Sequence, residues 1–477
     1  AQPPTLDPHM STAGATGDIS KMAFESLLTI DSKYNPVPML AESVDVNDDN
    51  TVFTFHLREG VTFHNGEEMT SEDVVASMNR WKEMSGVASN TFGDAEFVAI
   101  DDLTVQLELE ESSGIALGVM ASNEQFAAIM PKEVIDAAAA DGVNEFIGTG
   151  PYQFVEWKQD QYIHYTRYDD YQPVELEPDG ISGKKVAYID DVYYHIVTDP
   201  STRLAGLQSG EYDIAYSLPS DNYEQLVNTE GIEVKSLYTS NIDLLYNKRG
   251  GLMQDPNMRK AVNAALDIDE IMKAALVTEE IYRLDASYMN IDIEQWATEV
   301  GGENYNISDP ELAKQLFDEA GYNGETIILM TTRDYEQYYN ASVVIKEQLN
   351  QIGVNAELEV YDWPTIVDRR EQADTWDLFV NAYPFKSDPT QLLQLNPEFA
   401  GGINDPKADE LMDAIRTATS TEEARQKWEE LQEYAWNEYL PMTKLGSQAG
   451  MYGVLERVEN VDLAPGGTVL WNAKVVE

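Results

Sequence analysis

A strand–helix–strand pattern between residues 327 and 361 constrains the fold more than any other part of the sequence. It consists of an apolar strand (IILMTT), a helix over about residues 338–351, a stop at Gly353 and a second strand. Two strands joined by a crossover helix pair in parallel, and the crossover is right-handed. A short helix and a further strand over residues 363–382 extend the same layer. The sequence therefore predicts an α/β region after about residue 250.

The first third of the chain has a different pattern. In residues 51–58 (TVFTFHLR), the large apolar side chains Phe53, Phe55 and Leu57 alternate with Val52, Thr54 and His56. Residues 105–109 alternate in the same way. This alternation is typical of half-buried antiparallel strands. Between them, Thr70 is placed to cap a helix over residues 71–84. We therefore expect an antiparallel-rich region before about residue 150.

Helix boundaries are marked clearly in the second half. The pairs Asp255–Pro256 and Asp309–Pro310 each combine an N-cap carboxylate with a proline at the first helical position, and Gly321 ends the second helix. A long amphipathic helix is expected from Thr421 to about Tyr439. We find no repeat with a period of 20 to 50 residues, which argues against a solenoid or a propeller.

Composition excludes several classes of protein. The chain has 85 acidic against 31 basic residues, a formal net charge of −54, so nucleic acid and anionic membranes would be repelled. It has no cysteine, which excludes disulfides, thiolate metal sites and cysteine nucleophiles. The longest uncharged run, residues 112–123, is too short to span a membrane. Because the chain starts at Ala1 without a methionine, we expect that a leader has been removed.

Catalytic and metal-binding motifs are mostly absent. The histidines form neither an HExxH motif nor a pair at helical spacing, which argues against a zinc site. The run DVNDDN at residues 45–50 lacks the glycine and the final glutamate of a calcium loop, and a turn explains it better. Among so many carboxylates some pair will lie close by chance, so a hydrolase with an acidic dyad stays open as an alternative.

The order of several longer motifs resembles one known family. FHLREGVTFHNG and TSEDVVAS are the most specific of them, and together the motifs extend along essentially the whole chain. They resemble the family 5 extracellular solute-binding proteins of ABC importers, which include dipeptide, oligopeptide and nickel binders. The motifs are LDPH (6–9), FESLL (24–28), PMLAES (38–43), FHLREGVTFHNG (55–66), TSEDVVAS (70–77), GTGPYQFVEW (148–157), DPNMRKAVNAALD (255–267) and AKQLFDEAG (313–321).

The resemblance implies an α/β fold of the type II periplasmic-binding-protein kind, with two lobes and an additional inserted domain. Ligand would lie between domains I and III, and closure would be a hinge motion that the solute stabilises by contacting both lobes. The expected division is residues 1–36, 148–246 and 447–477 for domain I, 37–147 for the antiparallel-rich domain II, and 247–446 for domain III.

The resemblance also implies a set of ligand-contacting residues. On the domain I side, one loop would contact the ligand backbone, an aromatic of domain II would close the cleft, and the hinge strand would contribute polar groups. On the domain III side, Trp363 and Arg370 keep the Trp-to-Arg spacing of peptide binders, and Arg370 would meet a ligand carboxylate. A solvated arginine beside Glu371 is the alternative. The residues expected on this side are Thr16, Gly17, Asp18, Ser240 and Asn241 of domain I and Phe92 of domain II.

The segment from Tyr383 to Pro389 (YPFKSDP) departs from the family pattern. Peptide binders carry an aspartate there that receives the ligand α-ammonium, whereas this chain has Phe385 followed by Lys386. An ammonium buried without a carboxylate costs several kcal/mol. Either another acid substitutes, with Asp388 and Asp362 as candidates, or the ligand has no ammonium at that end. Lys386 and Arg370 together favour an anionic or N-blocked solute.

The resemblance thus implies a non-enzymatic binding protein without cofactor or metal. It would capture a peptide or peptide-like solute in the periplasm or at the cell surface, with a removed lipid-anchored leader as one form of attachment, and deliver it to ABC permease subunits as a monomer. One alternative is a non-peptide solute: an opine, a glutathione-like anion, an oligosaccharide or a metal chelate. The nickel-chelate pattern is not evident, because residues 247–446 contain no histidine. A signalling or chaperone-like use of the same fold is a further alternative.

The net charge of −54 predicts a response to salt. Self-repulsion destabilises a compact domain, and 1 M salt shortens the Debye length to about 3 Å. We therefore expect a saline or otherwise ion-rich habitat. We also expect the melting temperature to keep rising with NaCl well beyond about 0.2 M. Thermal unfolding followed by circular dichroism at increasing NaCl measures this, and a flat response would refute it.

Overall fold

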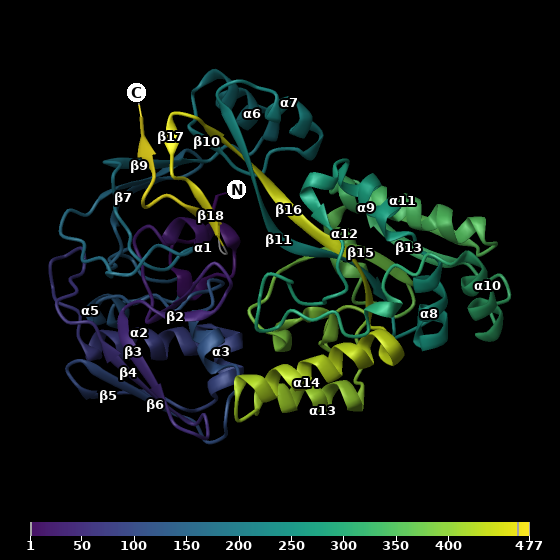
Figure 1. Ribbon diagram of the computed structural model, residues 1–477, viewed down its shortest axis with the longest axis horizontal. Coiled ribbons are helices and arrows are strands. Elements are labelled where there is room, and N and C mark those ends of the chain that lie inside the picture. The colour runs from purple at the N-terminus through teal and green to yellow at the C-terminus, as the bar shows by residue number, and fades with distance from the viewer. Residues whose placement is uncertain (1, 465–466, 477) are drawn as a thin grey trace.

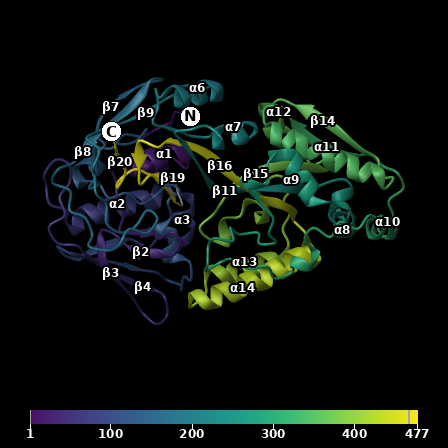
Figure 2. The same ribbon diagram turned by 45° about the horizontal axis from the view of Figure 1, so that its top comes forward.

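The chain forms two lobes that are joined by two long strands (Figure 1). The computed structural model describes residues 2–464 and 467–476. The two strands are β11 (Ile232–Tyr246) and β16 (Met442–Leu455). The chain before β11 and after β16 forms what we call the first lobe, and the chain between them forms the second lobe. The same two groups of elements stay on either side of the strand pair when the molecule is turned (Figure 2).

The antiparallel region predicted for the first third of the chain is confirmed in the first lobe. Its sheet has the order β3 (Ala41–Val46), β4 (Val52–Leu57), β6 (Thr104–Glu108) and β5 (Phe97–Asp101), and all of its neighbours pair antiparallel. In β4, Phe53, Phe55 and Leu57 are buried, as the period-two pattern predicts. The alternating side chains therefore direct one face of this sheet into the core.

Helix α2 (Ser71–Met84) begins where the sequence predicts it. The backbone N–H of Thr70 donates to the Asp73 carboxylate over 2.8 Å, which is one half of a capping box. Val74, Met78 and Trp81 are buried on one side of the helix. A second antiparallel sheet of this lobe consists of β7 (Tyr152–Lys158), β8 (Tyr162–Arg167) and β9 (Asp191–His195).

The predicted strand–helix–strand unit is confirmed in the second lobe. β13 (Ile327–Thr332) and β14 (Ala356–Tyr361) pair in parallel, and α11 (Glu336–Gln351) connects them. β15 (Leu378–Pro384) extends this layer, pairing parallel with β13 and antiparallel with β11. The sheet therefore continues from the second lobe into the connecting strands, in the order β10-β16-β11-β15-β13-β14 with β12 beside β16.

The predicted helix starts of the second half are also confirmed. The Asp255 side chain accepts from the N–H of Asn257, and the Asp309 side chain accepts from the N–H of Leu312. The long helix predicted from Thr421 runs as an α-helix to Tyr434 and then widens into a π-helical turn over Ala435–Tyr439.

The remaining elements are short or pack around these sheets. Within the described residues, no helix is both long and apolar enough to cross a lipid bilayer. The remaining helices are α1 (Gly14–Ser20), α3 (Gly86–Phe92), α4 (Ala116–Ala121), α5 (Lys132–Asp136), α6 (Pro200–Ser209), α7 (Tyr223–Val227), α8 (Pro256–Ala265), α9 (Ile268–Leu276), α10 (Pro310–Glu319), α12 (Trp363–Arg369), α13 (Pro406–Arg416) and α14 (Thr421–Tyr434). The remaining strands are β1 (Leu28–Ile30), β2 (Pro36–Pro38), β10 (Ile214–Ala215), β12 (Tyr282–Arg283), β17 (Val458–Glu459), β18 (Asp462–Ala464), β19 (Gly467–Val469) and β20 (Lys474–Val475).

The connecting strands β11 and β16 pair along almost their whole length. Their antiparallel register runs from Ile232 opposite Leu455 to Leu245 opposite Met442, with irregularities next to Tyr238 and Ile242. From Ser240 onward, β11 also pairs with β15 of the second lobe. β11 therefore pairs with the second lobe from Ser240 onward, and the domain boundary expected at residue 246 stays a prediction.

The two lobes also touch away from these strands. The Ser112 hydroxyl donates to the carbonyl of Thr417 over 2.6 Å, and Lys33 forms an ion pair with Glu294 at 3.2 Å. Gly114 lies so close to α14 that a Cβ there would be 3.1 Å from the Cβ of Ala424. The structure is therefore a closed arrangement of the lobes.

A buried ion pair anchors β16 where it enters the second lobe. Lys444 is fully buried and lies 2.5 Å from the Asp285 carboxylate, and it also donates to the Ser287 carbonyl over 2.6 Å. Burial lowers the pKa of Lys444, and the Asp285 charge opposes this shift. Neighbouring Asp243 accepts from Gln394, and burial raises its pKa to about 7. Most polar groups at this point thus have partners inside the core, whereas the buried Oδ1 of Asp243 has none among the described residues.

Removing the Lys444 ammonium should destabilise the fold strongly. Lys444→Met leaves the Asp285 carboxylate buried without its main partner, and breaking a buried pair costs about 3–5 kcal/mol. Urea unfolding at pH 7 measures this. Lys33→Met, which removes an exposed pair between the lobes, is the control and should change the free energy of unfolding far less. Equal losses in the two variants would contradict this prediction.

Candidate ligand-binding site

A cavity of about 850 Å³ lies against the first lobe and reaches the interface between the lobes. Its walls come from α1, from β9 and the chain after it, from β10, and from the part of β11 near the crossing. Asn123, Glu124 and Gln125 of the first lobe and Pro384 and Phe385 of the second lobe complete the lining. Residues from both lobes therefore face one space, and most of its lining comes from the first lobe.

Helix α1 is held in place by polar contacts of its own side chains. The Thr16 hydroxyl donates to the Thr5 carbonyl over 2.8 Å, and the Asp18 carboxylate accepts from the backbone N–H of Thr468 over 3.0 Å. At Gly17 a Cβ would lie 3.2 Å from the carbonyl oxygen of Asn123, so glycine permits the close approach of that loop. These contacts fix the face of α1 that lines the cavity.

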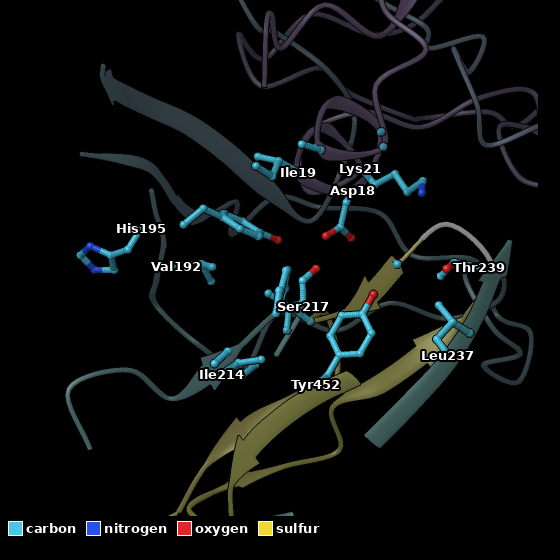
Figure 3. Close-up of a pocket in the computed structure, with 18 of the residues that line it drawn as sticks. Asp18, Ile19, Lys21, Val192, His195, Ile214, Ser217, Leu237, Thr239 and Tyr452 are labelled. Atoms are coloured by element: carbon cyan, nitrogen blue, oxygen red, sulfur yellow. The ribbon is translucent and has the colours of Figure 1, made fainter. Parts of the chain in front are cut away.

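Asp18 presents a sheltered carboxylate to the cavity. Figure 3 shows its oxygens directed toward the space between the surrounding side chains, while the side chain of Lys21 extends away from it. Burial raises the pKa of Asp18 to about 6, although the Lys21 charge and the bond from Thr468 act in the opposite direction. Burial likewise lowers the pKa of Lys21 to about 8.

Three tyrosines surround this carboxylate. Tyr194, Tyr216 and Tyr452 line the cavity, and the rings of Tyr216 and Tyr452 meet edge to face at a centroid distance of 5.4 Å. Burial raises the pKa of each hydroxyl, and the nearby Asp18 charge adds to each shift, bringing the pKa of Tyr452 to about 12. The buried hydroxyl of Tyr194 has no hydrogen-bond partner among the described residues. All three phenols therefore stay neutral at physiological pH.

The charged groups that line the cavity are mostly acidic. Among the described lining residues, the basic side chains are Lys21 and Arg203, and the histidine His195 lines the cavity as well. The Arg203 guanidinium makes its hydrogen bonds within the protein. It donates to the backbone carbonyls of Val197, Thr198, Tyr216 and Ser217. The acidic side chains in the lining are Asp18, Glu124, Asp191, Glu211 and Asp213.

Some of the residues singled out from the sequence line this cavity. Gly17 and Asp18 do so from α1, Ser240 from β11 and Phe385 from the end of β15. The backbone N–H of Phe385 donates to the carbonyl of Thr239 over 3.1 Å, which attaches the second-lobe loop to the crossing strand. The hydroxyl of Ser240 accepts from the Gln448 side-chain amide over 2.9 Å.

Other residues predicted for the domain I side have structural contacts instead. Thr16 is bonded to Thr5 as described, and the side-chain amide of Asn241 donates to the carbonyl of Tyr288 over 2.9 Å. Phe92 is buried, with its ring centroid 6.0 Å from that of Trp81. Within the described parts of the chain, the lining of the cavity does not include these three side chains.

Arg370 and Trp363 lie in the second lobe and outside the described lining of the cavity. The Arg370 Nε is 3.3 Å from the Glu371 carboxylate, and its guanidinium lies 5.4 Å from the ring centroid of Phe399. Trp363 packs against Tyr335 at a centroid distance of 5.0 Å. Arg370 therefore pairs with Glu371 in this arrangement, and its contact with a ligand carboxylate stays a prediction.

The proposed substitutes for the missing aspartate also serve local structure. Asp388 is buried and accepts from the backbone N–H of Thr390 over 2.9 Å, at the start of a single-turn helix. Asp362 caps α12 by accepting from the N–H of Thr365 over 2.9 Å. Tyr383 is buried beneath this region. The described residues around the cavity include none of these three.

Lys386 forms an ion pair between the lobes. Its ammonium lies 2.8 Å from the carboxylate of Glu124, and both side chains are largely covered. Lys386 comes from the loop after β15 of the second lobe, and Glu124 from the loop after α4 of the first lobe. The sequence marked Lys386 as unusual but could not indicate its partner.

Sequence reasoning missed Tyr194, Tyr216 and Tyr452. The only signal was the cluster of aromatic residues over 188–194, which is equally typical of a core. Among the described residues, no group of three or more histidine, cysteine, aspartate or glutamate side chains is placed to hold a metal ion. The cavity is suited to non-covalent binding of a small solute through aromatic rings and a few polar groups.

Comparison with known proteins agrees with this architecture. The family of bacterial extracellular solute-binding proteins, family 5 (middle), matches residues 35–397. A probable peptide ABC transporter periplasmic-binding protein of Sinorhizobium fredii is 30% identical over 466 residues, covering 92% of this chain and 86% of the relative. An oligopeptide-binding protein of Bacillus subtilis is 26% identical, with coverage of 90% and 82%. An ABC transporter substrate-binding protein of Listeria monocytogenes has a similar structure, with a TM-score of 0.88 at 20% identity over 100% of this chain and 98% of the other.

The ion pair between Lys386 and Glu124 should favour the closed arrangement, because it exists only when the lobes meet. We expect Lys386→Gln to shift the unliganded protein toward open forms and to increase its radius of gyration in small-angle X-ray scattering. Lys407→Gln is the matched control, since Lys407 pairs with Glu438 inside the second lobe. An unchanged radius of gyration for Lys386→Gln would show that the pair does not influence closure.

Proposed function

Because the chain belongs to the family 5 bacterial extracellular solute-binding proteins, we propose that it captures a peptide or peptide-like solute between its lobes for an ABC transporter. It is a binding protein and not an enzyme. The relatives named above bind peptides or oligopeptides according to their descriptions. The alternative of an acidic-dyad hydrolase thereby loses its basis.

The observation that carries this proposal is the cavity of about 850 Å³ whose lining comes from both lobes. Pockets of roughly 300–1,000 Å³ enclose most of a small ligand, so the cavity has room for a short peptide. A solute that contacts both lobes stabilises the closed form over the open one. The strand pair β11 and β16 is the connection about which the lobes would separate, and the pair Lys386–Glu124 would break as they do.

The division into domains and the cellular setting follow from the same proposal. The family is extracytoplasmic. We place the protein in the periplasm or on the cell surface, with a lipid-anchored leader as one form of attachment, and we expect it to meet the permease as a monomer. Domain I would comprise residues 1–36, 148–246 and 447–477, domain II residues 37–147, and domain III residues 247–446.

A thermal-shift screen with dipeptides and tripeptides tests the function. A ligand at 100 times its Kd stabilises the fold by about 2.7 kcal/mol, which raises the melting temperature measurably. Opines, glutathione and oligosaccharides form the comparison panel. A shift from these and none from peptides would overturn peptide capture while leaving solute capture intact. No shift with any class would count against the whole proposal.

A pair of tryptophan substitutions on β11 tests whether the cavity is the binding site. Thr239 lines the cavity and is exposed to it, so Thr239→Trp should fill part of the space and weaken binding by at least about tenfold, the loss expected when a well-packed ligand no longer fits. Ser236→Trp places the same side chain on the same strand, outside the described lining, and should bind normally. Isothermal titration calorimetry with a peptide found in the screen measures both. Equal affinities would move the site elsewhere.

A further inference from the structure

The carboxylate of Asp18 is sheltered within the cavity of the first lobe. It lies inside the cavity, and its described protein contacts are the Thr468 N–H at 3.0 Å and the charge of Lys21. Figure 3 shows the Lys21 side chain running away from the cavity, whereas the Asp18 oxygens face into it. A sheltered carboxylate is costly unless a cation or hydrogen-bond donors satisfy its oxygens. The side of Asp18 that faces the cavity is thus open to a donor that a solute could supply.

Aromatic rings form the walls around this carboxylate. Tyr194, Tyr216 and Tyr452 line the cavity, and Figure 3 shows the Tyr452 hydroxyl directed toward the region of Asp18. The Tyr194 hydroxyl is buried and has no partner among the described residues. Aromatic faces attract cations through their quadrupole, most strongly where water is excluded. A carboxylate among tyrosines is an arrangement that recognises an ammonium group.

The other charged side chains of the lining are mostly acidic, which also suits a cationic group. The lysine and arginine among the described lining residues are Lys21 and Arg203, and the Arg203 guanidinium donates to backbone carbonyls. His195 also lines the cavity, and Glu124, another lining residue, is paired with Lys386. The acids in the lining outnumber these basic groups, so the lining favours a cationic over an anionic end group. Lys386 itself lies outside the described lining, and Glu124 already pairs with its ammonium.

We infer that the cavity binds its solute by a cationic end, a protonated amine or ammonium that the Asp18 carboxylate receives within the walls of Tyr194, Tyr216 and Tyr452. The inference rests on the proposed function, because it assigns one end of the solute that the cavity captures. In a peptide this end is the α-ammonium. The acid that receives it then comes from the first lobe and takes the place of the aspartate that Phe385 replaces in the second lobe.

Binding should weaken in acid. Free Asp18 has a pKa raised to about 6, mainly by burial, and the groups that face it are Lys21 and the three tyrosines. The tyrosines stay neutral, and Lys21 gains charge as the pH falls through its pKa of about 8. Below pH 6 a cationic solute must displace the Asp18 proton, so its affinity should fall by up to about tenfold for each pH unit.

The test compares matched probes by isothermal titration calorimetry at pH 7.5. The probes are Ala-Ala and Leu-Leu, their N-acetyl derivatives, the non-peptide cations choline and putrescine, and maltose as a neutral solute. The variants are Asp18→Asn, which keeps the shape and an acceptor for Thr468, and the control Asp169→Asn. Asp169 is an exposed acid of the first lobe that pairs with Arg167 at 2.8 Å and lies outside the described lining of the cavity.

Free dipeptides should bind, and both N-acetylation and Asp18→Asn should weaken binding by at least about tenfold, the loss expected for a hydrogen bond between charged groups. Asp169→Asn should bind normally. Tyr452→Phe keeps the ring and should retain most of the affinity, whereas Tyr452→Leu should lose several-fold. Equal binding of free and N-acetylated dipeptides would overturn the inference and leave peptide capture standing. Binding of choline or putrescine alone, lost in Asp18→Asn, would support the inference and overturn peptide capture.

Binding of maltose alone, or of no probe, would overturn the inference as well as peptide capture. Folding of the variant is checked separately. Since the folded state raises the pKa of Asp18 above its ordinary value of 3.8, the ionised carboxylate costs stability above pH 6 and not below about pH 4. Unliganded Asp18→Asn should therefore melt at the same or a higher temperature than the parent at pH 7.5, and this difference should vanish toward pH 4. A lower melting temperature of Asp18→Asn than of the parent at pH 7.5 would show that the Asp18 carboxylate stabilises the fold. That result would contradict a carboxylate kept available for a cationic ligand.

Discussion

The pairing of β11 with β16 is the constraint on which the rest of the structure depends. These strands run antiparallel from the first lobe into the second, and each lobe is built onto one end of the pair. The irregularity beside Tyr238 falls where β15 begins to pair with β11. Because both crossings lie side by side, the lobes can separate without breaking either core. The cavity adjoins this crossing, because Leu237, Tyr238, Thr239 and Ser240 of β11 belong to its lining.

The large negative charge is distributed unevenly between surface and interior. Several basic side chains are withdrawn into the protein, where each meets an acid: Lys444 with Asp285, Lys185 with Glu25 at 3.0 Å, and Arg80 with Asp7 at 2.6 Å. Each such pair is neutral, so the net negative charge of the chain lies outside these pairs. Buried pairs add little net stability but are costly to break. The charge of the chain thus affects recognition as well as solubility, since an acidic cavity favours a cationic solute.

Local elements followed the sequence closely. The period-two pattern of β4, the Thr70 cap of α2 and the Asp-Pro starts of α8 and α10 all depend on neighbours within a few residues. The candidate site did not follow in the same way. Lys386 and Arg370 stood out as cations beside a cleft loop, but their partners proved to be Glu124 and Glu371. The first of these lies far away in the chain, and no local pattern identifies it.

The sequence by itself determined the family, the kinds of element in each region and the acidity of the whole, because motif order, periodicity and composition are properties of the chain alone. Only the tertiary structure decided which side chains share the cavity. Asp18, Tyr194 and Tyr452 come from the beginning, the middle and the end of the chain, and they meet because β16 returns beside β11 and closes the first lobe. A contact between residues so distant depends on packing, which no local preference encodes.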